Sequence, residues 1–145
     1  RREICHGMEY CDILKVADDE LAFLTGCSTL EQGARELQKQ YGIPLILVTE
    51  GGKGSHALIH DYFIDAAACN VEVVDTTGAG DGFFGCFLAS LLKSGKTLAE
   101  LTGDEVYQML RLANAAGALA VTRKGAIPAL ATTAEALALL EQNPQ

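Results

Sequence analysis

The residues with the clearest potential for chemistry lie between Asp75 and Asp81, in the run DTTGAGD. A β-branched segment precedes this run, and an apolar-periodic segment begins at Asp81. This pattern predicts a strand, a glycine turn and the N-terminus of a helix. Such a junction presents unpaired backbone N–H groups and the positive end of a helix dipole, which together bind anions such as phosphate. The Asp81 carboxylate would repel the anion, so it indicates a role in chemistry; the alternative role is that of a simple helix N-cap.

Two common phosphate-binding motifs do not fit this chain. The dinucleotide fingerprint G-x-G-x-x-G, counted from Gly78, requires a glycine where Phe83 stands. A Walker loop requires a hydroxyl residue directly after its lysine, but Lys53 in GGKGS is followed by Gly54. The glycine run therefore belongs to neither class.

The elements that must position these residues alternate between strands and helices. The expected strands are residues 11–16, 45–49, 55–59, 62–65 and 71–74. The expected helices are residues 17–26, 28–42, 81–95, 104–121 and 132–142. Capping boxes are expected at Ser28 with Glu31, Thr97 with Glu100, and Thr132 with Glu135. The alternation predicts a single α/β domain over residues 1–145, with a mostly parallel sheet flanked by helices.

Composition excludes several classes of protein. The 145 residues carry a formal net charge of −8, and the 11 Lys and Arg residues are scattered, which argues against nucleic-acid binding. No apolar run approaches the roughly 18 residues of a membrane helix, so we expect no membrane partner and a cytoplasmic location. A small-molecule partner fits this composition best.

Cysteines and histidines give no metal or disulfide pattern. The five cysteines form an odd set without a C-x-x-C pair, which predicts reduced thiols. His56 and His60 fall on a predicted strand and its turn rather than on one helix face, so we expect core or surface histidines instead of ligands.

The run DTTGAGD resembles the second signature of the ribokinase-like carbohydrate kinases, the PfkB family, at all seven positions. The segments ELAFLTG (20–26), VTEGGKGS (48–55) and ANAAGALAVTRKGAIPAL (113–130) resemble family segments in the same order. Within the family, KVADDELAFLTG and KGAIPAL are most similar to bacterial fructokinases. The resemblance covers essentially the whole chain.

This resemblance implies a ribokinase-like fold and the C-terminal, nucleotide-binding half of a longer kinase. In the family, the first half carries the sugar-binding residues, the first glycine signature and a small β lid, so we expect the N-terminal half and the lid to be absent. A sheet cut on one side exposes an apolar edge, which predicts low stability unless a partner covers it. The full-length protein is expected to be a homodimer.

The resemblance also implies roles for the glycine run. Asp81 corresponds to the catalytic base, because a carboxylate within hydrogen-bond reach accepts the proton of a sugar hydroxyl as the bond to phosphorus forms. The N–H groups of Ala79, Gly80 and Asp81 would stabilise charge on the transferred phosphoryl group. Gly78 and Gly80 let the backbone approach the phosphate.

Glu20 corresponds to the glutamate of the family's Asn-x-x-Glu motif, which acts on Mg²⁺ through water. Ala17 stands at the asparagine position, and Lys15 is expected to supply the missing phosphate contact. The alternative is that the acidic residues here only complement a helix dipole.

The remaining roles concern the nucleotide and a monovalent cation. The nucleotide-binding turn and the small-residue helix beside the adenine correspond to Thr49, Gly51, Gly54, Asn114, Gly117 and Ala118. Core packing alone is the alternative explanation of that helix. The K⁺ site corresponds to Asp75 and the carbonyl groups of Thr77, Ala120, Arg123 and Gly125, although Ala129 replaces a serine of some members.

The function implied is Mg²⁺- and ATP-dependent phosphorylation of a sugar hydroxyl, with fructose as the expected sugar. Ribose and 2-keto-3-deoxygluconate remain alternative substrates. The rival from another class is a nucleotide-binding fragment without catalytic activity.

Overall fold

The computed structural model describes residues 6–125 and 129–143, and four strands form its one sheet. They are β1 (Ile13–Ala17), β2 (Leu45–Thr49), β3 (Gly54–Ile59) and β4 (Tyr62–Ala67), in that spatial order. β1 and β2 are parallel, whereas β2–β3 and β3–β4 are antiparallel. The α/β class is confirmed, but the expectation of a mostly parallel sheet is wrong for these strands. The physical reason is the short connections, since only antiparallel strands can be joined by a turn as short as His60-Asp61.

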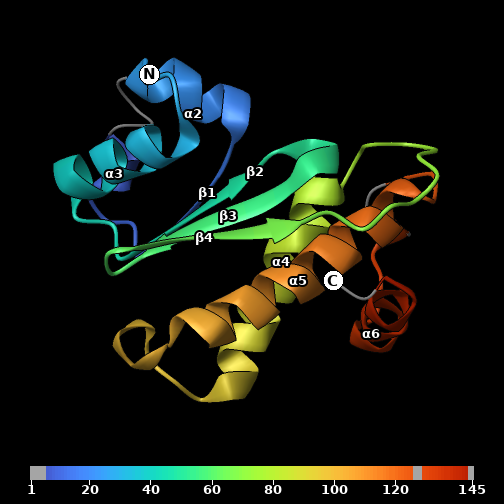
Figure 1. The fold of residues 1–145 in the computed structure, drawn as a ribbon. Coiled ribbons are helices and arrows are strands. Elements are labelled where there is room, and N and C mark those ends of the chain that lie inside the picture. Colours follow the sequence, from blue (N-terminus) through green and yellow to red (C-terminus); the bar gives the residue numbers. More distant parts are fainter. Residues whose placement is uncertain (1–5, 126–128, 144–145) are drawn as a thin grey trace.

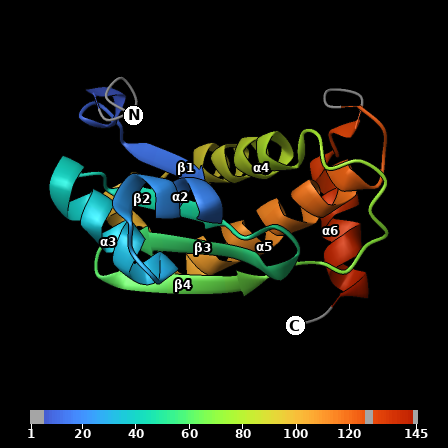
Figure 2. The ribbon, with the colours of Figure 1, turned by 90° about the horizontal axis from the view of Figure 1, so that it is seen from above.

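Helices cover both faces of this sheet (Figure 1). α2 (Asp18–Thr25) and α3 (Leu30–Tyr41) connect β1 to β2 on one face. α4 (Ala79–Ser94) and α5 (Gly103–Val121) lie on the other face, and α6 (Thr133–Gln142) lies beside α5 (Figure 2). Two short 3₁₀ helices, η1 (Gly51–Lys53) and η2 (Leu98–Glu100), complete the described elements.

The alternation of side chains in β2 explains the continuous apolar run of this strand. Leu45 and Leu47 belong to the core beneath α4 and α5, whereas Ile46 and Val48 belong to the core beneath α2 and α3. All four side chains are fully buried. A strand covered on both faces must be apolar on both, which is why LILVT could be recognised from the sequence.

The predicted strand over residues 71–74 is absent from the described structure. This segment belongs to an irregular connection between β4 and α4, and Val73 and Val74 are exposed. The backbone N–H groups of Val74 and Asp75 both donate to the carbonyl oxygen of Val121, at 2.7 and 3.0 Å. The end of α5, and not a neighbouring strand, therefore holds the segment.

Helix starts agree with the sequence in some places and differ in others. The predicted Thr132–Glu135 capping box at the start of α6 is confirmed. The Thr97–Glu100 box also forms but caps η2, while α5 begins at its own box of Thr102 and Glu105. Two other helices begin at different residues from those predicted. The N-cap of α3 is Thr29 instead of Ser28, and α4 begins at Ala79 rather than Asp81.

Within the described residues, the cysteines at positions 11, 27, 69 and 86 are free thiols. The same part of the chain contains no cluster of three or more His, Cys, Asp or Glu side chains able to hold a metal ion. None of its helices is long and apolar enough to cross a membrane.

Candidate active site

The N-terminus of α4 presents free backbone donors. Gly78 is the N-cap, and the first helical hydrogen bond runs from the N–H of Gly82 to the carbonyl oxygen of Gly78 at 2.8 Å. In the described part of the chain the N–H groups of Gly80 and Asp81 have no acceptor, and that of Ala79 makes only a 3.4 Å contact with the Thr76 carbonyl. Unpaired N–H groups at the positive end of a helix dipole attract an anion.

Lys15 brings a positive charge to the same place. A Cβ atom built on Gly80 would lie 3.0 Å from the Lys15 Nζ atom, so the ammonium group approaches the backbone of the glycine run directly. Lys15 lies in β1, near the strand end that leads into α2. The fold thus adds a side-chain cation to the backbone donors of α4.

Asp81 lies in the first turn of α4 with an exposed side chain. No hydrogen bond or ion pair engages its carboxylate within the residues that the structure describes. A carboxylate that no neighbour occupies is available to accept a proton from a bound hydroxyl group.

Asp75 fastens the glycine run to the segment after α5. Its Oδ1 accepts the Thr77 N–H at 2.9 Å, and its Oδ2 accepts the Gly125 N–H at 3.2 Å. These hydrogen bonds, chiefly those from Thr77, lower the pKa of the Asp75 carboxyl and keep it ionised. Three residues expected at the monovalent cation site therefore meet. Of the other two, Ala120 lies in the last turn of α5, and the Arg123 side chain binds Glu135 at 2.6 Å.

A cavity of about 320 Å³ lies between the turn after β2, the connection from β4 to α4, and α5. The predicted site residues that line it are Thr49, Gly51, Gly54, Ala79, Gly80, Asn114, Gly117 and Ala118. They come from segments that are far apart in the sequence. The cavity reaches the N-terminus of α4 through Ala79 and Gly80, so it is continuous with the anion-binding donors.

Sequence reasoning missed one wall of this cavity. The connection from β4 to α4 contributes Ala68, Cys69, Asn70, Val71, Val73 and Thr76. The β-branched run before Asp75 predicts a strand rather than a cavity wall, and no local pattern marks Ala68, Cys69 and Asn70. Apolar side chains dominate the wall, and burial raises the pKa of the Cys69 thiol, which keeps it protonated. An apolar wall beside a few polar groups suits a planar ligand such as a nucleobase.

Asn114 has a structural role in addition to its place at the cavity. Its side chain is 8% exposed, and its Nδ2 donates to the carbonyl oxygens of Ala66 and Ala67, at 3.0 and 3.1 Å. The amide thus fastens the end of β4 to α5. A polar side chain in a helix of small residues was the available signal, but its partners depend on the tertiary fold.

Two glycines of the cavity are required by close approach. Gly54 has a φ of +125°, and a Cβ atom there would lie 2.2 Å from the Ala66 carbonyl oxygen. A Cβ atom on Gly117 would lie 3.1 Å from the Ala79 carbonyl oxygen, where α5 meets the start of α4. Larger residues would push these elements apart and change the cavity.

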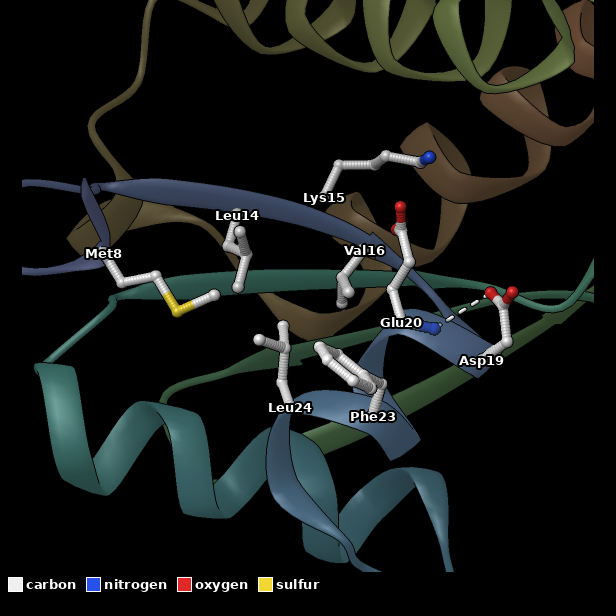
Figure 3. A pocket seen from close by; sticks show the side chains of 8 residues that line it. All are labelled: Met8, Leu14, Lys15, Val16, Asp19, Glu20, Phe23 and Leu24. Atoms are coloured by element: carbon white, nitrogen blue, oxygen red, sulfur yellow. Dashed lines mark hydrogen bonds between the residues drawn. The ribbon is translucent and has the colours of Figure 1, made fainter. Parts of the chain in front are cut away.

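A second cavity, of about 390 Å³, lies between β1 and α2 (Figure 3). Its floor is apolar, and Lys15, Asp19 and Glu20 supply its polar side chains. Figure 3 shows the Glu20 carboxylate directed toward the side of the cavity where the Lys15 ammonium lies. One Glu20 oxygen, Oε2, accepts the Ala17 N–H at 2.8 Å, which caps α2.

These side chains fit an indirectly held Mg²⁺ better than a metal cage. Glu20 keeps a second carboxylate oxygen, and hard oxygen donors suit Mg²⁺. No described cluster of three acidic, His or Cys side chains surrounds this point. Mg²⁺ is commonly bound by one or two carboxylates, water and the phosphates of a substrate, which such a set permits.

Comparison with known proteins gives the family. Residues 1–133 match the pfkB family of carbohydrate kinases. The chain belongs to this family. Its ribokinase-like fold is shared with a fructokinase of Xylella fastidiosa with bound ATP, at a TM-score of 0.88 and 27% identity. A fructokinase of Vibrio cholerae, solved with fructose, ADP and calcium, gives a TM-score of 0.82 and 33% identity.

Curated relatives agree with the solved structures. Probable fructokinase-2 of Arabidopsis thaliana is 39% identical over 141 residues, and fructokinase-1 of Zea mays is 37% identical over 142 residues. The matches cover 97% and 98% of this chain, but only 42% and 43% of those relatives. The two solved fructokinases are covered to 47% and 44%. The chain therefore spans less than half the length of these relatives, and the expected resemblance to fructokinases is confirmed.

Proposed function

We propose that this chain supplies the ATP-binding side and the catalytic base of a kinase that phosphorylates fructose. The observation that carries the proposal is the cavity that opens onto the N-terminus of α4, lined by the glycine turn, the connection to α4 and the small-residue face of α5. The Lys15 ammonium lies at the same glycine run. Such an arrangement suits a nucleotide whose phosphates end beside Asp81.

The nucleoside part of ATP fits the apolar region of the cavity. Val71, Val73 and Phe83 offer apolar surface, and the small residues of α5 let a flat base lie close to the helix. The phosphates then extend toward Gly80, where free N–H groups and Lys15 supply positive charge. The donors stabilise the charge that spreads over the phosphoryl oxygens during transfer.

Asp81 acts as general base in this proposal. The sugar hydroxyl oxygen forms a bond to the γ-phosphorus, the bond from that phosphorus to the bridging oxygen breaks, and ADP leaves. The hydroxyl proton moves to the Asp81 carboxylate, which is exposed and unpaired among the described residues. Mg²⁺, when bound, neutralises phosphate charge, and Glu20 and Asp19 are the residues that would hold it through water.

Relatives support the ligands proposed. A similar protein of Escherichia coli was solved with ATP and Mg²⁺, and the Vibrio cholerae fructokinase with fructose, ADP and potassium. Ribose is the second candidate sugar, since an Arabidopsis thaliana ribokinase with ribose and ATP is 33% identical at a TM-score of 0.75.

The test measures ATP-dependent phosphorylation of fructose and ribose by the chain, alone and mixed with the part of Arabidopsis probable fructokinase-2 that it does not match. We expect Asp81→Asn to lower the rate by about 10²- to 10⁴-fold without weakening ATP binding. Asp104→Asn, an exposed acid in the first turn of α5, is the matched control. Full activity of Asp81→Asn would exclude Asp81 as the base, and ATP binding without turnover in any mixture would favour the non-catalytic alternative.

A further inference from the structure

The ring of His56 lies between two carboxylates on the face of the sheet covered by α2 and α3, opposite the cavity of about 320 Å³ beside α5. Its Nδ1 is 2.6 Å from the Asp65 Oδ1, and its Nε2 is 3.2 Å from the Glu50 Oε2. The ring stacks on Phe63, with a centroid distance of 5.4 Å and an interplanar angle of 10°. The His56 side chain is 18% exposed, so little water competes for either nitrogen.

A charged ring would satisfy both contacts at once. A neutral imidazole has one donor and one acceptor nitrogen, whereas ionised carboxylates only accept. A neutral His56 would therefore satisfy one carboxylate and turn a lone pair toward the other. An imidazolium would donate to both, so the geometry suits a cation between Glu50 and Asp65.

Glu50 connects this ring to the cavity. It follows Thr49 and precedes the glycine turn, and its N–H donates to the Gly54 carbonyl at 2.9 Å. Its Oε1 accepts from the Lys53 ammonium at 2.5 Å, within the same turn. Hydrogen bonds from Lys53 and then from His56 lower the pKa of the Glu50 carboxyl, which keeps it ionised.

We propose that the protonated His56 is a positioning residue for nucleotide binding: its imidazolium ties Glu50 to Asp65 and thereby fixes the glycine turn that lines the cavity. This inference rests on the proposed binding of ATP. When the ring loses its proton, the shorter contact to Asp65 retains the remaining N–H, and the contact to Glu50 is lost. Nucleotide affinity then decreases as pH rises.

The surrounding charges agree with this direction. Glu50 faces the ring from the turn after β2, and Asp65 faces it from β4. Lys53 lies on the far side of Glu50, and Asp18 of α2 acts on Lys53. The direct neighbours of the ring are thus both carboxylates.

The experiment measures ATP affinity of the whole chain from about pH 5.5 to about pH 8, where histidine changes charge. From the acidic to the alkaline end of this range, the Kd for ATP should increase in the parent by a factor about five times larger than in His56→Gln. His6→Gln is the control, because His6 pairs with Glu9 at an exposed site outside the residues that line the cavity. Protonation of ATP itself affects all variants equally and cancels. Asp65→Asn, at a side chain that is 71% exposed, should reduce the pH dependence without threatening the fold.

Two further readouts separate this inference from the function. At the acidic end of the pH range, the ring ¹⁵N shifts of His56 in the parent should show both nitrogens protonated. At the alkaline end, amide hydrogen exchange of residues Gly51–Gly54, corrected for intrinsic rates, should become faster in the parent but not in His56→Gln. Identical pH profiles of ATP affinity for the parent and His56→Gln would overturn the proposal. If ATP does not bind at any pH, the proposed function fails, and the exchange of the turn alone decides whether His56 fixes it.

Discussion

Two kinds of positive group meet at the start of α4: the ammonium of Lys15 and the free N–H groups of Gly80 and Asp81. They would contribute differently to the binding of a phosphate. The N–H groups belong to the backbone and cannot be removed by substitution, whereas the Lys15 ammonium can be. A cation 3.0 Å from the Cβ position of Gly80 can contact a phosphate held by the glycine run. We expect the charge at this point to supply the phosphate contact that Ala17 cannot make.

Lys15→Met tests this charge. We expect a roughly tenfold weaker affinity for ATP, because a charge-assisted hydrogen bond to phosphate is lost, and an unchanged affinity for adenosine. Calorimetric titration with both ligands measures the difference. Lys39→Met, at an exposed lysine in the last turn of α3, serves as control. Equal losses for ATP and adenosine would mean that Lys15 supports the fold and not the phosphate.

Ser55 places a polar hydroxyl group in the buried interior of the sheet. Its side chain is fully buried in β3, and its hydroxyl oxygen has no hydrogen-bond partner among the residues that the structure describes. A buried hydroxyl group without a partner costs about 1–3 kcal/mol. We therefore expect Ser55→Ala to raise the free energy of unfolding by about 1 kcal/mol in urea titrations. The exposed Ser28→Ala should change nothing, and a destabilised Ser55→Ala would reveal a partner for the hydroxyl.

At the scale of elements, one glutamate links the start of α6 to the segment after α5, beside the apolar packing of α6 on α5. Glu135 accepts from the N–H and hydroxyl of Thr132 at the start of the helix and binds Arg123, which follows α5. These interactions, that of the Thr132 N–H first, lower the pKa of Glu135 from 4.5 to about 2. Because the folded pKa is lowered, the stabilisation is complete above the unfolded pKa and is lost as pH falls through about 2.

Glu135→Gln should therefore lower the melting temperature near neutral pH and reduce its fall in acid. Melting curves between about pH 6 and about pH 2 measure both effects. Glu141→Gln, at an exposed acid of the same helix, should keep the acid dependence of the parent. An unchanged acid dependence in Glu135→Gln would mean that other carboxylates, such as Glu105, control acid unfolding.

Gly54 in β3 and Gly85 in α4 differ in whether the surrounding structure leaves room for a Cβ atom. Gly54 begins β3 in a conformation and a space that exclude a Cβ atom, whereas a Cβ atom on Gly85 in α4 meets nothing within 4 Å. We expect Gly54→Ala to destabilise the fold by about 3 kcal/mol, and Gly85→Ala to stabilise it by about 0.5–1 kcal/mol. Urea titrations compare the two. Similar stability of both variants would show that the turn can shift away from the Ala66 carbonyl.

For the whole molecule, the sequence predicted what local patterns encode. The apolar run of β2, the hairpin around His60-Asp61 and the Thr132 cap each depend on neighbouring residues. The β-branched residues of the Val71–Val74 segment favour a strand, while its backbone partner in the structure is Val121, far along the chain. The same long-range placement explains why the apolar cavity wall, the Asn114 contacts and the His56 ion pairs were not predicted.

Ligand binding should couple these distant segments into one more stable unit. The cavity joins the turn after β2, the connection to α4 and α5, so an occupant that contacts all of them opposes unfolding of the whole chain. At an ATP concentration of 100 times the Kd, the gain is about 2.7 kcal/mol, or about 8 °C in melting temperature for a chain of this size.

Two adjacent exposed valines offer a matched pair of variants, because Val73 lines the cavity and Val74 does not. Val73→Ser should shrink the ATP-dependent shift and Val74→Ser should not, while both keep the melting temperature of the free chain. If ATP stabilises both variants equally, the nucleotide lies elsewhere, and the residues gathered around this cavity serve packing alone.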